Sequence, residues 1–109
     1  MVQHVQTLTE ADFDQHVGSA LQPVLVDFWA EDCSSCKALF PLLEELAQEH
    51  TGALRVGAVR LDDAPGLARR FDIMKLPTLM VFVDGEPVKR IVDIQHNADL
   101  VDALEEFLR

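Results

Sequence analysis

The stretch VLVDFWAEDCSSCKALFP occupies residues 24–41 and decides how the rest of the chain is interpreted. Its first part, Val24–Trp29, is mostly β-branched or aromatic, which favours a strand buried on both faces of a sheet, with one acid, Asp27, inside it. Residues 34–49 place apolar side chains at helical spacing, and Pro41 predicts a kink in that helix because its ring removes a backbone donor. Cys33 and Cys36 therefore lie where a buried strand passes into a helix.

Outside this stretch the sequence predicts helices and strands in alternation. A capping box at Thr9 and Asp12 predicts a helix that ends at about Gly18. A strand over residues 54–61 and a short helix over residues 65–71 follow later in the chain. Strands over residues 78–83 and 88–94 are joined by an Asp84-Gly85 turn, and the last helix is capped by Asn97. The expected order is strand, helix, strand, helix, strand, helix, hairpin, helix, with no residue range for the first strand. Alternation followed by a hairpin indicates a mixed sheet with helices on both faces. Because no repeat or linker interrupts the chain, we expect one α/β domain over residues 1–109.

The net charge of the chain argues against two classes of binding partner. Nine Lys and Arg against 19 Asp and Glu give a formal net charge of −10 over 109 residues. Nucleic acids and anionic membrane surfaces need clustered cations, so we expect neither as a partner. The sequence contains no apolar run of membrane-spanning length, and its first residues lack the features of a signal peptide, which predicts a cytoplasmic protein. In that reducing compartment two neighbouring cysteines are expected to be catalytic, redox-active or metal-binding.

The spacing of Cys33 and Cys36 suits reversible disulfide chemistry. Side chains three apart in a first helical turn share a face, so a small tightening closes the bond. Cys33, ahead of the helix, faces unpaired N–H groups that favour an attacking thiolate, whereas Cys36, one turn inside, suits a resolving thiol. Asp27 is the candidate proton acceptor for Cys36, because burial raises the pKa of a carboxyl group.

Other interpretations of these residues stay open at this point. Two cysteines could form half of a zinc site, but zinc takes four ligands and the histidines at positions 4, 16, 50 and 96 form no cluster with them in sequence, so we expect no metal. The two thiols could also be small buried side chains with no chemistry. Asp27 could be a hydrogen-bonded structural acid.

Several motifs in order resemble those of the thioredoxin family across essentially the whole chain: residues 26–37, Pro41, Leu76-Pro77-Thr78 and Asp84-Gly85-Glu86. The resemblance implies the thioredoxin fold, a central mixed five-stranded sheet flanked by four helices. It implies Cys33 as nucleophile, Cys36 as resolving thiol and Asp27 as buried acid. It also implies a cis Pro77 beside the sulfurs and a Leu76 backbone that pairs with substrate, on a docking surface that includes Trp29.

The chain departs from the family pattern at and around this site. Ser34-Ser35 replaces Gly-Pro, and Asp32, Ala58 and Asp93 replace the usual Trp, Lys and Gly. A negative Asp32 beside the nucleophile disfavours the thiolate and predicts a more reducing couple, whereas a backbone N–H restored at Ser35 acts in the opposite direction. The sign of the net shift in reduction potential stays open. Without an ammonium at position 58, Asp27 is expected to stay protonated to higher pH than in typical relatives.

The same departures affect which client, that is, which disulfide-bonded substrate protein, the chain is expected to bind. Asp32 and Asp93 would lie on the rim of the docking surface and make it anionic, which predicts a dedicated partner with a basic surface. The alternative is that Lys37 or Lys75 pairs with these acids and the surface stays permissive.

The sequence thus predicts a thiol–disulfide oxidoreductase that reduces protein disulfides. It would be a monomer with no bound cofactor, served by an electron donor resembling thioredoxin reductase. Two alternatives remain, namely a binding or chaperone-like module for a dedicated partner, and a specialised oxidant or isomerase.

Overall fold

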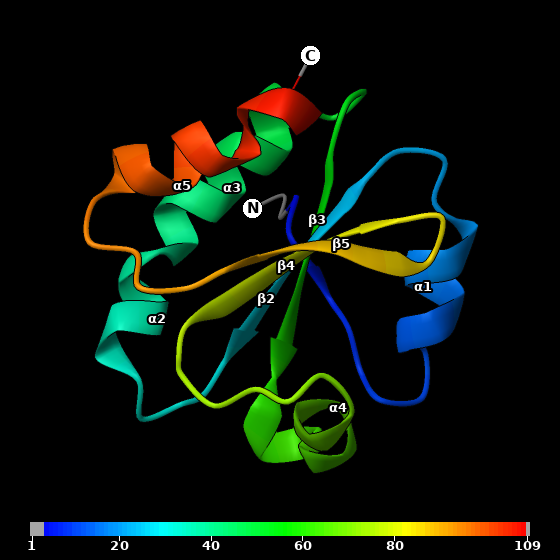
Figure 1. The fold of residues 1–109 in the computed structure, drawn as a ribbon, viewed down its shortest axis with the longest axis vertical. Helices are drawn as coiled ribbons and strands as arrows, with labels where there is room; N and C mark the ends of the chain where they lie inside the picture. The colour runs from blue at the N-terminus through cyan, green and yellow to red at the C-terminus, as the bar shows by residue number, and fades with distance from the viewer. Residues whose placement is uncertain (1–3, 109) are drawn as a thin grey trace.

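The computed structural model describes residues 4–108, which form a five-stranded sheet between two layers of helices (Figure 1). In chain order the elements are β1 (Gln6–Thr7), α1 (Phe13–Ser19), β2 (Val24–Trp29), α2 (Ser34–Ala38), α3 (Phe40–Glu49), β3 (Arg55–Arg60), the 3₁₀ turn η1 (Leu61–Asp63), α4 (Pro65–Arg70), β4 (Thr78–Val83), β5 (Glu86–Ile91), α5 (Asn97–Leu104) and the 3₁₀ turn η2 (Glu105–Phe107). The expected mixed α/β architecture is confirmed. The expected order begins with a strand, as observed, but the sequence pattern gives no residue range for β1 because two exposed residues carry no periodicity.

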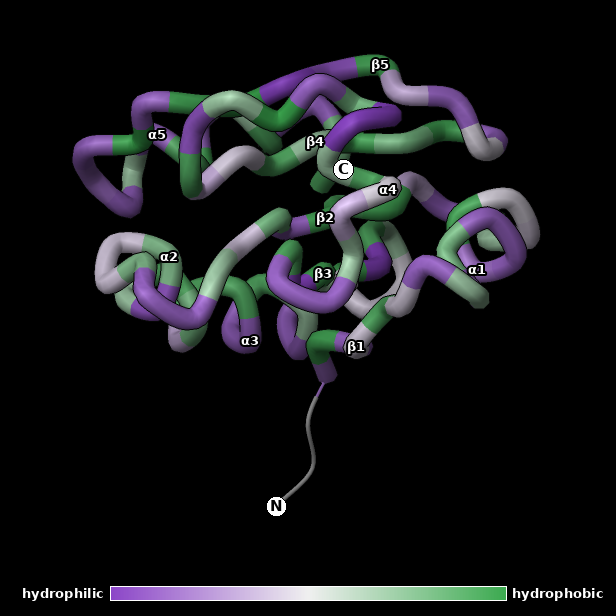
Figure 2. Tube along the Cα trace, turned by 90° about the horizontal axis from the view of Figure 1, so that it is seen from below, coloured by the Kyte–Doolittle hydropathy of each residue, from purple (hydrophilic) through white to green (hydrophobic). Residues whose placement is uncertain are grey.

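The strand order β1-β3-β2-β4-β5 combines parallel and antiparallel pairs. β1 and β2 pair with β3 in parallel, whereas β4 pairs with β2 and β5 antiparallel. In Figure 2 the strands follow one another in this order from β5 at the top to β1 at the bottom. The central strand β2 is therefore shielded by a strand on each side. Asp27 lies opposite Ala58 of β3 and Leu79 of β4.

The sheet divides the core in two, because successive side chains of a strand point to opposite faces. On one face Val26 and Phe28 pack with Phe13 of α1 and Leu67 of α4. On the other face Leu25 and Leu79 pack with side chains of α3 and α5, Leu43 and Leu100 among them. Figure 1 shows α1 and α4 on one side of the strands and α3 and α5 on the other.

The prediction of a single kinked helix over residues 34–49 is wrong in one respect. The chain forms two successive helices, α2 and α3, that meet at Leu39. Pro41 occupies the first turn of α3, where a backbone N–H has no helical partner and a fixed φ is already suitable. The proline therefore starts a new helix instead of bending an existing one.

Smaller differences concern where elements begin and end. Thr9 and Asp12 make the reciprocal bonds of a capping box, 2.8 Å and 3.3 Å long, but α1 starts only at Phe13. The last strand ends at Ile91 instead of residue 94, because Asp93 turns the chain with a positive φ of 58°. His96, not Asn97, is the N-cap of α5.

Candidate active site

Cys33 and Cys36 form a disulfide at the start of α2, so the structure shows the oxidised form of the pair. Their Cα atoms are 5.3 Å apart, inside the usual range for a disulfide. Cys33 is the N-cap of α2, and its Sγ accepts a 3.2 Å hydrogen bond from the backbone N–H of Cys36. The bond therefore closes within one helical turn, as the spacing predicts.

The two sulfurs differ in exposure. The Cys36 side chain is fully buried, whereas Cys33 is partly exposed. The Ser35 hydroxyl lies 3.4 Å from the Cys33 Sγ. The sequence predicts an effect of the Ser35 backbone N–H on this sulfur, whereas the contact observed is made by the Ser35 side chain. Of the two cysteines, Cys33 is therefore the more accessible from solvent.

Asp27 is buried in the middle of β2. Its side chain is 0% exposed, and neither carboxylate oxygen has a hydrogen-bond partner among residues 4–108. The residues opposite it in the sheet, Ala58 and Leu79, are apolar. Burial raises the pKa of Asp27 to about 7, because desolvation penalises the charged form. This carboxyl group can therefore give up or accept a proton near neutral pH.

The Leu76–Pro77 peptide bond is cis, as the resemblance implies. The antiparallel register places Thr78 of β4 opposite Phe28, so Leu76 and Pro77 lie at the end of β2 from which the chain runs on to Cys33. The Thr78 hydroxyl donates a 2.6 Å hydrogen bond to the backbone carbonyl of Lys75, which fixes the loop at the start of β4. Both Leu76 and Pro77 are partly exposed and accessible to a client.

The two acids expected on the rim are in different situations. Asp93 forms an ion pair with Lys75 at 3.2 Å, each side chain 64% exposed, which is the alternative that the sequence left open. Leu79 of β4 lies opposite Ile91, so Asp93 and the Lys75 loop share one end of the hairpin. Asp32 is exposed and makes no hydrogen bond or ion pair among the described residues. Of the two, only Asp32 offers an unpaired charge.

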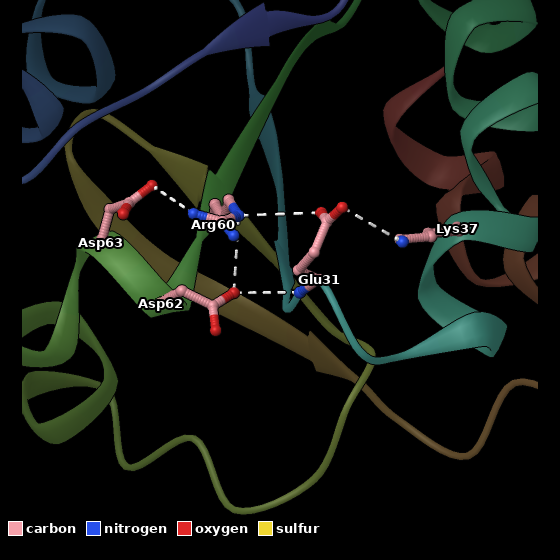
Figure 3. A network of polar contacts seen from close by, with 5 residues as sticks. All are labelled: Glu31, Lys37, Arg60, Asp62 and Asp63. Atoms are coloured by element: carbon pink, nitrogen blue, oxygen red, sulfur yellow. Dashed lines mark hydrogen bonds and ion pairs between the residues drawn. The ribbon is translucent and has the colours of Figure 1, made fainter.

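A polar network joins the active-site loop to the end of β3, and nothing in the sequence pattern had indicated it (Figure 3). Arg60 contacts Asp63 at 3.0 Å, Asp62 at 3.5 Å and Glu31 at 3.8 Å. Asp62 also accepts a 2.9 Å hydrogen bond from the Glu31 backbone N–H. Glu31 in turn contacts Lys37 at 3.4 Å, so the network reaches both ends of the segment that holds the disulfide.

Trp29 packs against helix α3. Its ring contacts the ring of Phe40 edge-on, with 4.9 Å between centroids, and it lines a pocket against α3.

Within residues 4–108, no three His, Cys, Asp or Glu side chains lie close enough to hold a metal ion together. No helix in the same range is long and apolar enough to cross a membrane.

Comparison with known proteins agrees with this geometry. The family described as Thioredoxin matches residues 4–106. Proteins named thioredoxin from Staphylococcus aureus strains Mu50, MW2 and N315 are each 42% identical over 101 residues, which cover 93% of this chain and 95% of theirs. Three observations point to the same family: the redox-active cysteine pair, the mixed sheet, and a sequence match along almost the whole length of the chain. The chain belongs to the thioredoxin family, and it is a thiol–disulfide oxidoreductase.

Proposed function

We propose that Cys33 is the nucleophile and Cys36 the resolving thiol in the reduction of client disulfides. The observation that carries the assignment is the difference in exposure between the two bonded sulfurs, since only a partly exposed thiolate can reach a client. The Cys33 thiolate attacks one client sulfur, a mixed disulfide forms, and the other client sulfur leaves as a thiolate that takes up a proton. Cys36 then attacks Cys33 Sγ and releases the second client thiolate.

Asp27 is proposed as the group that takes the proton of the Cys36 thiol before this second step. A carboxyl group with a pKa of about 7 accepts a proton near neutral pH more readily than an ordinary aspartate. The two electrons pass to the client, which leaves as a dithiol, and the Cys33–Cys36 pair is left oxidised as the disulfide that the structure shows.

Two cysteine variants test the assignment against each other. Cys36→Ser retains the attacking thiol and should accumulate a mixed disulfide with a disulfide-bonded client such as insulin, because nothing resolves it. Cys33→Ser should accumulate none. Non-reducing gels and mass spectrometry measure the adduct, and trapping by Cys33→Ser in place of Cys36→Ser would contradict the roles.

The docking surface is proposed to consist of Trp29, Leu76 and Pro77, flanked by Asp32 and Asp93. The unpaired Asp32 favours clients with a cation near the disulfide, whereas the Lys75–Asp93 pair leaves that part of the rim close to neutral. A panel of acidic and basic disulfide peptides, reduced by wild type and Asp32→Asn at two salt concentrations, tests the preference. Equal rates for both proteins on every peptide would refute it.

The family implies disulfide-bonded client proteins and a reductase that returns electrons to the pair. We propose that the protein acts as a monomer in the cytoplasm, needs no bound cofactor, and binds neither nucleic acid nor membrane. The net charge of −10 supports the last two points, and the reducing conditions of that compartment suit a reductant. The closed disulfide counts against a binding module whose cysteines are incidental.

A further inference from the structure

A pocket of about 510 Å³ opens between α3 and the edge of the sheet formed by β1 and β3. Its apolar lining includes Trp29, Phe40 and Leu43, and on β3 it includes the short side chain of Ala58. Trp29 and Phe40 pack edge-to-face, which holds the lining in place. The pocket is separate from the partly exposed Cys33, which does not line it.

An unpartnered carboxyl group lies next to this pocket. Ala58, one of the lining residues, is in parallel register with Asp27, so both side chains are on the α3 face of the sheet. Asp27 is 0% exposed, and both of its oxygens are without a hydrogen-bond partner among residues 4–108. A buried carboxyl group in this condition is unusual, because buried polar groups are nearly always hydrogen-bonded. A ligand that carries a donor past Ala58 would supply the missing partner.

The charges at the mouth of the pocket favour a cation. Glu44 and Asp63 line it together with Arg60. The guanidinium group of Arg60 is already engaged by Asp63, Asp62 and Glu31, so its charge is balanced. Glu44 accepts a hydrogen bond from the Val5 backbone N–H and contacts the His4 ring, and it retains its negative charge. The fixed charges around the opening therefore sum to a negative value.

We propose that this pocket binds a primary alkylammonium ion. The alkyl chain lies against Trp29, Phe40 and Leu43, and the ammonium group donates hydrogen bonds to the Asp27 carboxylate. The alkyl chain matches the apolar walls, which exclude water. The ammonium group matches the unpartnered carboxylate, because it is a compact hydrogen-bond donor with a full positive charge. The proposal is independent of the roles assigned to Cys33 and Cys36.

The probe is n-pentylammonium chloride, added to the oxidised protein at pH 8 and constant ionic strength, with 1-pentanol as the uncharged counterpart. Trp29 is the only tryptophan of the chain and reports occupancy by fluorescence. We expect saturable binding that is tighter than that of 1-pentanol. We also expect the apparent pKa of Asp27, followed by carbon NMR, to fall by about one to three pH units, as for a carboxylate beside an opposite charge.

Three variants test the site. Asp27→Asn should weaken n-pentylammonium binding about tenfold or more, since a charge-assisted hydrogen bond is lost. Ala58→Leu keeps the carboxyl group, fills the pocket and should abolish saturation, which covers the case in which Asp27→Asn does not fold. Glu49→Gln removes an exposed acid from the same helix, α3, and should leave binding unchanged. Equal affinity for n-pentylammonium in wild type and Asp27→Asn, or an unaffected Ala58→Leu, would overturn the proposal, as would equal affinity of wild type for 1-pentanol.

Discussion

Helices α1 and α4 cover one face of the sheet, and α3 and α5 cover the other, but the two faces are filled differently. On the α1/α4 face the rings of Phe13, Phe28, Phe71 and Phe82 contact one another, with centroids 5.4–6.4 Å apart. The α3/α5 face carries Asp27 and a core rich in leucines, Leu25, Leu43 and Leu79 among them, and it has a pocket of about 510 Å³. We refer to these as the aromatic face and the Asp27 face.

The comparison shows that one alternating strand serves two purposes. In β2, Val26 and Phe28 point to the aromatic face, whereas Leu25 and Asp27 point to the Asp27 face. Close packing on the first side contributes stability. On the second side an unpaired carboxyl group costs stability and retains a proton near neutral pH. Four predictions test this division, in order of expected effect.

The largest expected effect comes from the aromatic face. Phe28→Ala should lower the free energy of unfolding by about 3–5 kcal/mol, since it opens a cavity among packed rings. Phe40→Ala, at a partly exposed ring beside the pocket, should cost clearly less. Denaturant unfolding of the two variants measures the difference, and equal losses would show that the faces are packed alike.

The second prediction concerns pH. Asp27 has a folded-state pKa of about 7 against an ordinary value of 3.8, so between these values the folded state binds more protons than the unfolded state. Stability should therefore fall as pH rises from about 4 to 7, by up to about 1.4 kcal/mol per pH unit and about 4 kcal/mol in total.

In Asp27→Asn this part of the pH dependence should vanish, while contributions from other groups remain. The difference in unfolding free energy between variant and wild type should thus grow with pH and level off above 7. A difference that is flat from pH 4 to 8 would contradict the shifted pKa.

Adjacent residues on the two faces give a third, matched test. A Cβ added at Gly57 would lie 2.7 Å from Cδ1 of the buried Leu8, so Gly57→Ala should destabilise by about 1 kcal/mol or more. Ala58→Leu adds carbon atoms beside the pocket and should be neutral or stabilising by about 1 kcal/mol. Thermal unfolding compares the two, and the opposite order would mean that the pocket is closed in solution.

The smallest effect is expected on the rim. Asp93→Asn removes the ion pair with Lys75 but keeps a residue that tolerates the positive φ of 58°. Because the pair is exposed, stability should change by less than about 1 kcal/mol, and the change should shrink at high salt. A larger loss that is insensitive to salt would show that the pair holds the loop in place.

The sequence predicts the element order, the cysteine pair, the cis Pro77 and the buried Asp27, because each depends on local pattern or on a family motif. It does not predict the pocket or the network around Arg60. Both depend on which side chains the parallel register brings together, such as Ala58 beside Asp27 and Arg60 beside Glu31. The kink predicted at Pro41 is wrong for a related reason, since a proline bends or starts a helix according to where the preceding turn ends.

The central claim is that burial without a partner keeps Asp27 protonated up to neutral pH. The most direct test follows the Asp27 carboxyl carbon by NMR from pH 3 to 10 in the oxidised protein. The structure predicts a titration midpoint near 7. A midpoint close to the ordinary value of 3.8 would contradict the claim, because it would mean that the carboxylate is hydrated or paired in solution.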